Sequence, residues 1–286
     1  MNKNNFFSFI EPQRRAIENL IKSALEEDKA FFDITTRVLL KNKQASANII
    51  AREDGIISGC FIAEMVLQIF CSPDEKWDVS YKVTDGEKIR KDQVVMAISA
   101  PLFSLLATER TILNFITKLS GISTITRRFV DIAGKYGVKV RDTRKTIPGM
   151  RYLSKWAVIC GGGTPHRYDL YQHILVKDNH IMAVGSFEEV LSRLANIKKL
   201  NPWVEIEVEV SSLDEFNKAV NDDFIDIIML DNFSIDDIKK ALEINKRRKK
   251  IEVSGGITLN NLEAIAALGP DYISTGYITP VSYTHL

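Results

Sequence analysis

The sequence predicts an α/β fold in which an N-terminal α+β domain is followed by a domain built on parallel strands. Three observations support this fold class. After residue 138, short apolar runs alternate with helical patterns, which is typical of repeated βα units. Before residue 102, short β-like runs separated by turn residues surround one helical segment. The length of 286 residues also leaves room for two hydrophobic cores.

Residues 1–115 are assigned to the N-terminal α+β domain. A helix is expected from Glu11 to about Leu25, where apolar residues recur at helical spacing, and a short one over 61–70. A second helical region runs from about 102 to 134, with a break expected at Gly121. We place the domain boundary inside this region, near residue 115. The β-like runs of this domain cover residues 47–50, 56–57, 79–83 and 94–98.

Residues 116–286 are assigned to the α/β domain. The helical segments between its strands supply the crossover connections of a parallel sheet. Because the βα units are short, the pattern favours a barrel, although periodicity alone leaves a doubly wound sheet open. The expected strands cover residues 138–142, 174–177, 204–210, 225–230, 251–253 and 272–273.

Composition narrows the functional class. With 38 Lys+Arg against 37 Asp+Glu, the net charge of +1 provides no overall field to hold nucleic acid. No apolar run reaches the roughly 18 residues of a membrane span, so no membrane association is expected. Cys60, Cys71 and Cys160 are widely spaced and form no C-x-x-C motif, which predicts a reduced, cytoplasmic protein.

Cationic side chains gather near the ends of the expected strands, where parallel barrels build their active sites. An arginine fork matches two oxygens of a carboxylate or phosphate, so the cluster predicts a ligand with several negative charges. Two members, Arg151 and Lys155, are instead expected on a solvated helix face. The whole set is Arg141, Arg144, Lys145, Arg151, Lys155, His166, Arg167 and Lys177.

Two glycine-containing segments follow the last two expected strands. Ser254-Gly255-Gly256 and Ser274-Thr275-Gly276 can present backbone N–H groups to an anion, because glycine allows close approach and positive φ. As neighbours in a parallel sheet they predict a phosphate site.

Carboxylates complete the set of strand-end residues. Glu205, Glu207 and Glu209 alternate with apolar residues and therefore share one strand face, and Asp231 ends the next strand. Carboxylate and phosphate oxygens together suit Mg²⁺. Zinc is disfavoured, because the histidines show no helical i, i+4 pairing, and His173 is expected to be a packed residue.

Several long motifs resemble nicotinate-nucleotide pyrophosphorylase, also called quinolinate phosphoribosyltransferase. The resemblance covers about residues 11–279. The motifs are Asp33-Ile-Thr-Thr36, Glu109-Arg-Thr-Ile-Leu-Asn114, Asp142-Thr-Arg-Lys-Thr-Ile-Pro-Gly-Met-Arg151, Lys155-Trp-Ala-Val158, Gly161-Gly-Gly-Thr-Pro-His-Arg167, Leu175-Val-Lys-Asp-Asn-His180, Glu207-Val-Glu209, Leu230-Asp-Asn232, Ser254-Gly-Gly-Ile257 and Tyr272-Ile-Ser-Thr-Gly276.

The resemblance implies an open seven-stranded α/β barrel with an N-terminal α+β sandwich domain. It implies a homodimer in which each active site is completed by the partner subunit. The implied reaction joins quinolinate to phosphoribosyl pyrophosphate, giving nicotinate mononucleotide, pyrophosphate and CO₂ in NAD biosynthesis. Mg²⁺ would accompany the pyrophosphate.

The resemblance also implies residue roles. Arg110 would reach quinolinate across the dimer, and Thr143 would contact substrate. Lys145 and Lys177 would bind quinolinate and the phosphoribosyl phosphates. Glu209 and Asp231 would face the ribose and the Mg²⁺. These four residues form the expected catalytic set. Quinolinate would also be held by Arg144, His166 and Arg167, and a phosphate by Ser254, Gly255, Gly256, Ser274, Thr275 and Gly276.

Two departures from the family pattern bear on this reading. Thr164-Pro165 replaces a common Asn, and residues 280–286 replace the usual closing segment, which predicts a less stable chain. Three alternatives stay open: the related protein encoded with molybdate transporters, a non-catalytic binding protein, and a barrel enzyme for another phosphorylated compound. Asp142-Thr143 and Lys177-Asp178-Asn179 favour the quinolinate enzyme over the first alternative.

Overall fold

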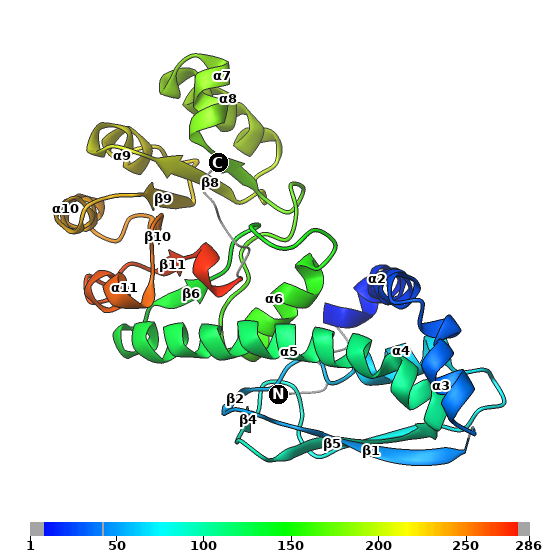
Figure 1. Cartoon of the computed structure of the whole chain (residues 1–286). Coiled ribbons are helices and arrows are strands. Elements are labelled where there is room, and N and C mark those ends of the chain that lie inside the picture. The colour runs from blue at the N-terminus through cyan, green and yellow to red at the C-terminus, as the bar shows by residue number, and fades with distance from the viewer. Residues whose placement is uncertain (1–8, 42, 280–286) are drawn as a thin grey trace. The chain divides into compact units, whose positions relative to one another are not determined.

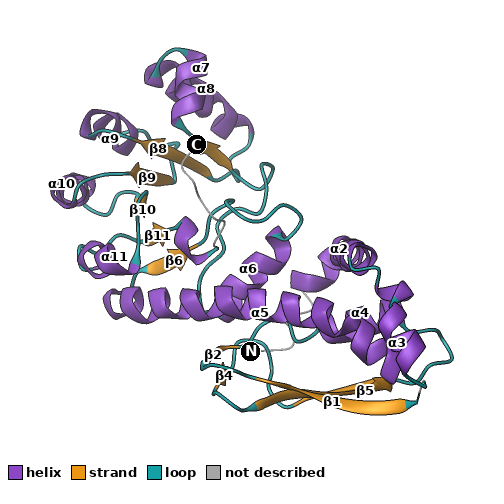
Figure 2. Cartoon of the chain, viewed as in Figure 1, coloured by secondary structure: helices purple, strands orange, loops and turns teal. Residues whose placement is uncertain are grey.

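The computed structural model describes residues 9–41 and 43–279, which form two compact units (Figures 1 and 2). Among the described residues, the first unit contains those up to 127 and 146–162, and the second contains 128–145 and 163–279. The prediction for residues 280–286 falls outside the described residues. Within the described ranges, no helix is long and apolar enough to cross a membrane.

The first unit combines helices with a small antiparallel sheet. In this sheet β5 lies between β1 and β3, and β2 pairs with β4 in a separate ladder. Helix α5 begins in this unit and ends in the second. The elements are α2 (Arg14–Glu27), α3 (Ile34–Leu39), β1 (Gln44–Ile50), β2 (Gly55–Ile56), α4 (Ile62–Phe70), β3 (Asp78–Tyr81), β4 (Lys88–Ile89), β5 (Val94–Pro101), α5 (Leu102–Ala133) and α6 (Arg151–Cys160).

The helical spacing of the first segment is confirmed, because Ile17, Ile21 and Leu25 are the buried residues of α2. Helix α3 was not predicted. Asp33 is its N-cap residue, a common residue type at this position, and the Asp33 side chain accepts a hydrogen bond from the amide of Thr36 at 3.1 Å.

The break predicted at Gly121 is wrong. Helix α5 is continuous over 32 residues, Leu102–Ala133. One glycine costs a helix only about 1 kcal/mol relative to alanine. The buried side chains of Leu119 and Ile122 on either side supply packing that outweighs this cost.

The solvated position predicted for Lys155 is also wrong, whereas Arg151, the first residue of α6, is partly exposed. Seven of the ten residues of α6 are buried, and Lys155 has no exposed surface. The helix is held in the first unit by Trp156, whose indole N–H donates to the carboxylate of Asp85 at 2.7 Å. Apolar packing on several sides of α6 therefore encloses the lysine.

The second unit is a parallel α/β arrangement. Its six strands pair in the order β6-β11-β10-β9-β8-β7, and each matches an expected strand. Figure 1 shows α9, α10 and α11 along one side of these strands. The elements are β6 (Lys139–Arg141), β7 (Ile174–Val176), α7 (Asp178–Val184), α8 (Phe187–Leu200), β8 (Ile206–Val210), α9 (Leu213–Val220), β9 (Ile227–Asp231), α10 (Ile235–Asn245), β10 (Lys250–Ser254), α11 (Leu259–Ala266) and β11 (Tyr272–Ser274).

The six-stranded sheet is strongly curved. The segment after residue 163 pairs beside β6 through a bridge between Arg141 and Thr164, at one edge of the sheet. His166, two residues further on, lies 3.2 Å from Glu207 on β8, near the opposite edge. Side chains from distant parts of the strand row therefore meet in a buried interior.

Candidate active site

The register of the sheet brings the carboxyl ends of the strands into line. Asp231 at the end of β9 is opposite Ser254 at the end of β10, and Ser274 at the end of β11 is opposite Arg141 at the end of β6. The predicted residues that end or directly follow these strands therefore lie along a single edge of the sheet. This edge is the candidate active site.

Two hydrogen bonds from Thr275 connect the segment after β11 to the segment after β10 and to the end of β6. Thr275 donates its hydroxyl to the carbonyl of Ile257 at 2.8 Å, and its amide donates to the carbonyl of Arg141 at 3.1 Å. A Cβ on Gly276 would lie 3.3 Å from Cδ of Lys145. A larger residue at position 276 would therefore push against the Lys145 side chain.

Gly255 has φ +89°, a conformation in which other residues are strained. A Cβ there would lie 2.3 Å from the Oδ1 of Asn232, so the segment after β10 packs closely against the end of β9. Gly256 also has positive φ, +61°. Successive glycines of this kind can direct backbone N–H groups toward an anion.

Lys177 and Glu209 form an ion pair between the segment after β7 and strand β8. Burial raises the pKa of the Glu209 carboxyl, the Lys177 ammonium opposes this rise, and the charge of Asp231 adds to it. Two carboxylates and a lysine therefore lie together at the ends of β7, β8 and β9. Oxygen ligands of this kind fit Mg²⁺.

Arg144 and Arg167 lie near enough to repel each other. Burial lowers the pKa of the Arg167 guanidinium, and the charge of Arg144 lowers it further. The charge of Glu207 acts in the opposite direction. Two neighbouring arginines in a partly buried setting have the chemistry to bind a ligand with two negative charges.

A buried network of charged side chains joins β6, β8 and β10. Arg141 pairs with Glu252 at 2.6 Å and stacks on the ring of Tyr272, 3.5 Å from its centre. Burial and the neighbouring Glu207 raise the pKa of Glu252. Burial alone would raise the pKa of Glu207, but His166 and His173, each with Nε2 3.2 Å away, lower it to about 2.

The ligand atoms of His166, His173 and Glu207 lie within 4.8 Å of one another, close enough to be considered as a metal site. The hydrogen bonding of His166 argues against this. The amide of Arg167 donates to Nδ1 of His166 at 2.8 Å, so the proton of the neutral ring is on Nε2. That nitrogen faces Glu207 and has no free lone pair for a metal.

Three predicted residues are placed differently from the strand-end group. Ser274 is fully buried, and its proximity to Glu252 helps to lower the pKa of that carboxyl. His166 is buried with its ring directed at the interior carboxylates. Arg110 is exposed and belongs to the first unit, where it lines a cavity of about 440 Å³ with Lys118 and Glu27.

Sequence reasoning missed Glu252 and Asp142 as members of the site. Glu252 is a carboxylate between two apolar residues of a strand, the same signal that identified Glu207. Asp142 has no exposed surface and accepts a hydrogen bond from the amide of His166 at 2.7 Å. Residues 142 and 166 are far apart in the chain, so no local pattern indicates their contact.

Comparison with known proteins gives one consistent result. The family model "Quinolinate phosphoribosyl transferase, C-terminal domain" matches residues 122–284, and the corresponding N-terminal domain model matches residues 33–120. The probable nicotinate-nucleotide pyrophosphorylase [carboxylating] of Bacillus subtilis is 35% identical over 263 residues, covering 92% of this chain and 89% of that protein. The Mycobacterium leprae nicotinate-nucleotide pyrophosphorylase [carboxylating] is 36% identical over 269 residues, with coverage of 92% and 93%.

Solved structures agree with the sequence relatives. The nicotinate-nucleotide pyrophosphorylase from Francisella tularensis superimposes with a TM-score of 0.86 at 38% identity, covering 93% of this chain and 92% of that chain. The corresponding structure from Ehrlichia chaffeensis gives a TM-score of 0.84 at 37% identity, with coverage of 91% and 93%. With both domain models matched in order along one chain, this protein belongs to the quinolinate phosphoribosyltransferase family.

Proposed function

We propose that this protein transfers the phosphoribosyl group of phosphoribosyl pyrophosphate to quinolinate and releases CO₂. The products are nicotinate mononucleotide and pyrophosphate, in NAD biosynthesis. Family membership supports the reaction. The observation that carries it is the pair Arg144 and Arg167, whose mutual repulsion is relieved by a ligand with two carboxylates.

The two arginines hold the carboxylates of quinolinate in this proposal. His166 supports them from behind, because its ring accepts the amide of Arg167 and faces Glu207. Thr143 and Lys145 contribute from the segment after β6, where the hydroxyl of Thr143 accepts the amide of Lys145 at 3.1 Å. Quinolinate is thereby held at the end of the strand row that carries β6.

The phosphoribosyl group occupies the neighbouring strand ends. Backbone N–H groups of the segments 254–256 and 274–276 receive its phosphate, while Glu209 and Asp231 face the ribose. The carboxylates stabilise the positive charge that develops at ribose C1 as pyrophosphate departs. Mg²⁺, held through pyrophosphate oxygens beside Glu209 and Asp231, would neutralise charge on the leaving group.

Positioning and electrostatics account for the chemistry. The ring nitrogen of quinolinate forms a bond to C1, and the C1–oxygen bond breaks with its electron pair going to pyrophosphate. The pyridinium then withdraws electrons from the adjacent carboxylate, the carbon–carbon bond breaks, and CO₂ leaves. The ring carbon keeps the electron pair and takes a proton from solvent. Lys177, paired with Glu209, supplies positive charge near the departing phosphates.

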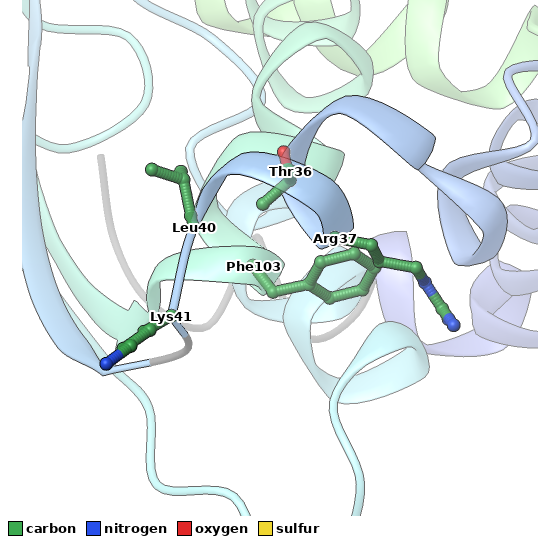
Figure 3. A pocket seen from close by; sticks show the side chains of 5 residues that line it. All are labelled: Thr36, Arg37, Leu40, Lys41 and Phe103. Atoms are coloured by element: carbon green, nitrogen blue, oxygen red, sulfur yellow. The ribbon is translucent and has the colours of Figure 1, made fainter.

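We further propose that the subunits form a homodimer in which Arg110 completes the partner's site. The exposed residues Ile34, Val38 and Leu39 of α3 support this, because each is more than 70% exposed and subunit interfaces cover such apolar faces. Beside them lies a cavity of about 260 Å³ (Figure 3). Arg37 extends over the ring of Phe103, 5.2 Å from its centre, on one side of this cavity.

Two further expectations belong to the same proposal. The bridge between Arg141 and Thr164 would supply the seventh strand of an open barrel, and the curvature of the sheet supports closure. A cytoplasmic location is supported by the free thiols of Cys60, Cys71 and Cys160.

The reaction is tested by incubating purified protein with quinolinate, phosphoribosyl pyrophosphate and Mg²⁺ and by measuring nicotinate mononucleotide and CO₂ together. Equal amounts of both products are expected. Nicotinate in place of quinolinate is the matched control, since it offers one carboxylate and no CO₂ to release. Folded protein that binds both substrates without turnover would instead indicate a binding protein.

A further inference from the structure

We propose that Asp142 is a positioning residue that fixes the spacing of the two arginines by joining the segments that carry them. This inference rests on the proposed function and deepens it. Arg144 follows Asp142 by two residues after β6, and Arg167 belongs to the segment that runs beside β6 through the Arg141–Thr164 bridge. The carboxylate of Asp142 connects these segments through its bond to the amide of His166.

The hydrogen bond from the amide of His166 to Asp142 replaces one of the regular backbone hydrogen bonds between two parallel strands. The amide of Thr164 donates to the carbonyl of Val140 at 2.8 Å, as in an ordinary parallel pair. In such a ladder the next donor and acceptor lie two residues further along each strand, at 166 and 142. Here the acceptor for the amide of His166 is the side-chain Oδ1 of Asp142, at 2.7 Å. The side chain therefore holds the two segments together where the regular backbone pairing stops.

The amide that follows is also held by a side chain. The amide of Arg167 donates to Nδ1 of His166, and Nε2 of the same ring lies 3.2 Å from the buried Glu207. The peptide groups of both 166 and 167 are thus fixed from inside the sheet. These two contacts fix the main-chain direction at Arg167 and therefore the point from which its side chain leaves the backbone.

The positions of Arg144 and Arg167 need such support before substrate arrives. Burial and the charge of Arg144 both disfavour the charged form of Arg167, so repulsion tends to drive the two segments apart. A side chain with no exposed surface resists this better than an exposed one, because water does not compete for its hydrogen bond. Holding the site in its binding geometry lowers the cost of binding quinolinate.

Two substitutions separate the hydrogen bond from the charge. Asp142→Ala removes the acceptor, and Asp142→Asn keeps an acceptor oxygen while removing the charge. Asp271→Ala is the matched control, because the Asp271 carboxylate accepts the amide of Ile251 at 2.8 Å at the opposite end of the same sheet. KM values for quinolinate and for phosphoribosyl pyrophosphate are measured for each variant and for the wild type.

Asp142→Ala is expected to raise the quinolinate KM about tenfold, with the phosphoribosyl pyrophosphate KM within about twofold of wild type. Asp142→Asn should stay within about threefold for both substrates. Asp271→Ala should change neither KM. Equal rises in both KM values for Asp142→Ala would overturn the proposal, since they would indicate general damage to the site.

If the Asp142→Ala variant does not fold, the KM values of Asp142→Asn alone test the proposal. A quinolinate KM near that of wild type supports the hydrogen bond, and a tenfold rise in folded Asp142→Asn overturns it in favour of the charge. Wild-type protein that turns over quinolinate establishes the function independently of these results. Wild-type protein that neither turns over nor binds quinolinate overturns both the proposed function and the role of Asp142.

Discussion

Replacing Arg144 by alanine is expected to weaken quinolinate binding selectively. A charge-assisted hydrogen bond contributes about 1.5–3 kcal/mol, and a guanidinium can make two of them to one carboxylate. Arg144 also repels Arg167, so its removal lets the remaining arginine bind its own carboxylate more strongly. This relief offsets part of the loss and leaves about 2 kcal/mol, or roughly thirtyfold in Kd.

Titration calorimetry with each substrate separately measures this effect. Quinolinate affinity should fall roughly thirtyfold, and the affinity for phosphoribosyl pyrophosphate should stay within about twofold. Arg144→Lys is the matched control, because it keeps the charge and loses the planar fork. Its quinolinate affinity should lie between those of the wild type and the alanine variant.

The assignment would be refuted by an equal loss of affinity for both substrates in Arg144→Ala. That outcome would place Arg144 at a position shared by both ligands or in the support of the whole strand-end region. An unchanged quinolinate affinity would refute it as well, since Arg167 alone would then carry the recognition.

Three further predictions concern the shared site and the buried network. Mixing inactive Arg110→Ala and Lys177→Ala subunits should restore roughly a quarter of wild-type turnover, because half of the randomly mixed dimers regain one complete site. If turnover does not recover after subunit exchange, a shared site is excluded. Arg141→Met should lower the free energy of unfolding, measured in urea, by about 3–5 kcal/mol, because it leaves the carboxylate of Glu252 buried without its cation. A loss below about 1 kcal/mol would contradict the pairing of Arg141 with Glu252. The lowered pKa of Glu207 means that its contribution to stability is complete above about pH 4.5 and is lost as pH falls toward 2. Urea unfolding between these pH values should therefore show a steeper loss in wild type than in Glu207→Gln.

The order of strands and helices in the second unit was predictable from local pattern. Each strand contains a short apolar run, and four of the six strands, β6, β9, β10 and β11, end on a polar residue at the carboxyl edge of the sheet. Asp231 and Ser254 illustrate this, since each ends its strand in the structure as in the prediction. Motif spacing then identified the family before any geometry was considered.

Other features depend on tertiary packing and were not predictable. Gly121 lies in an unbroken helix because neighbours distant from its local pattern stabilise that helix. Lys155 reads as a surface residue in a helical pattern, yet α6 is enclosed and the lysine has no exposed surface. Propensity describes a residue in an average environment, so it fails where packing imposes an unusual one.

The buried carboxylates explain how a nearly neutral chain maintains a cationic site. An acidic residue within hydrogen-bond reach of Arg167 would occupy the donors that a substrate carboxylate needs. Glu207 instead acts on Arg167 through space and favours its charged form from inside the sheet. Glu207 is in turn stabilised by His166 and His173. The interior of the sheet therefore supplies counter-charge without a carboxylate bonded to the guanidinium, whose Nη1 donates instead to the carbonyl of His173 at 3.3 Å.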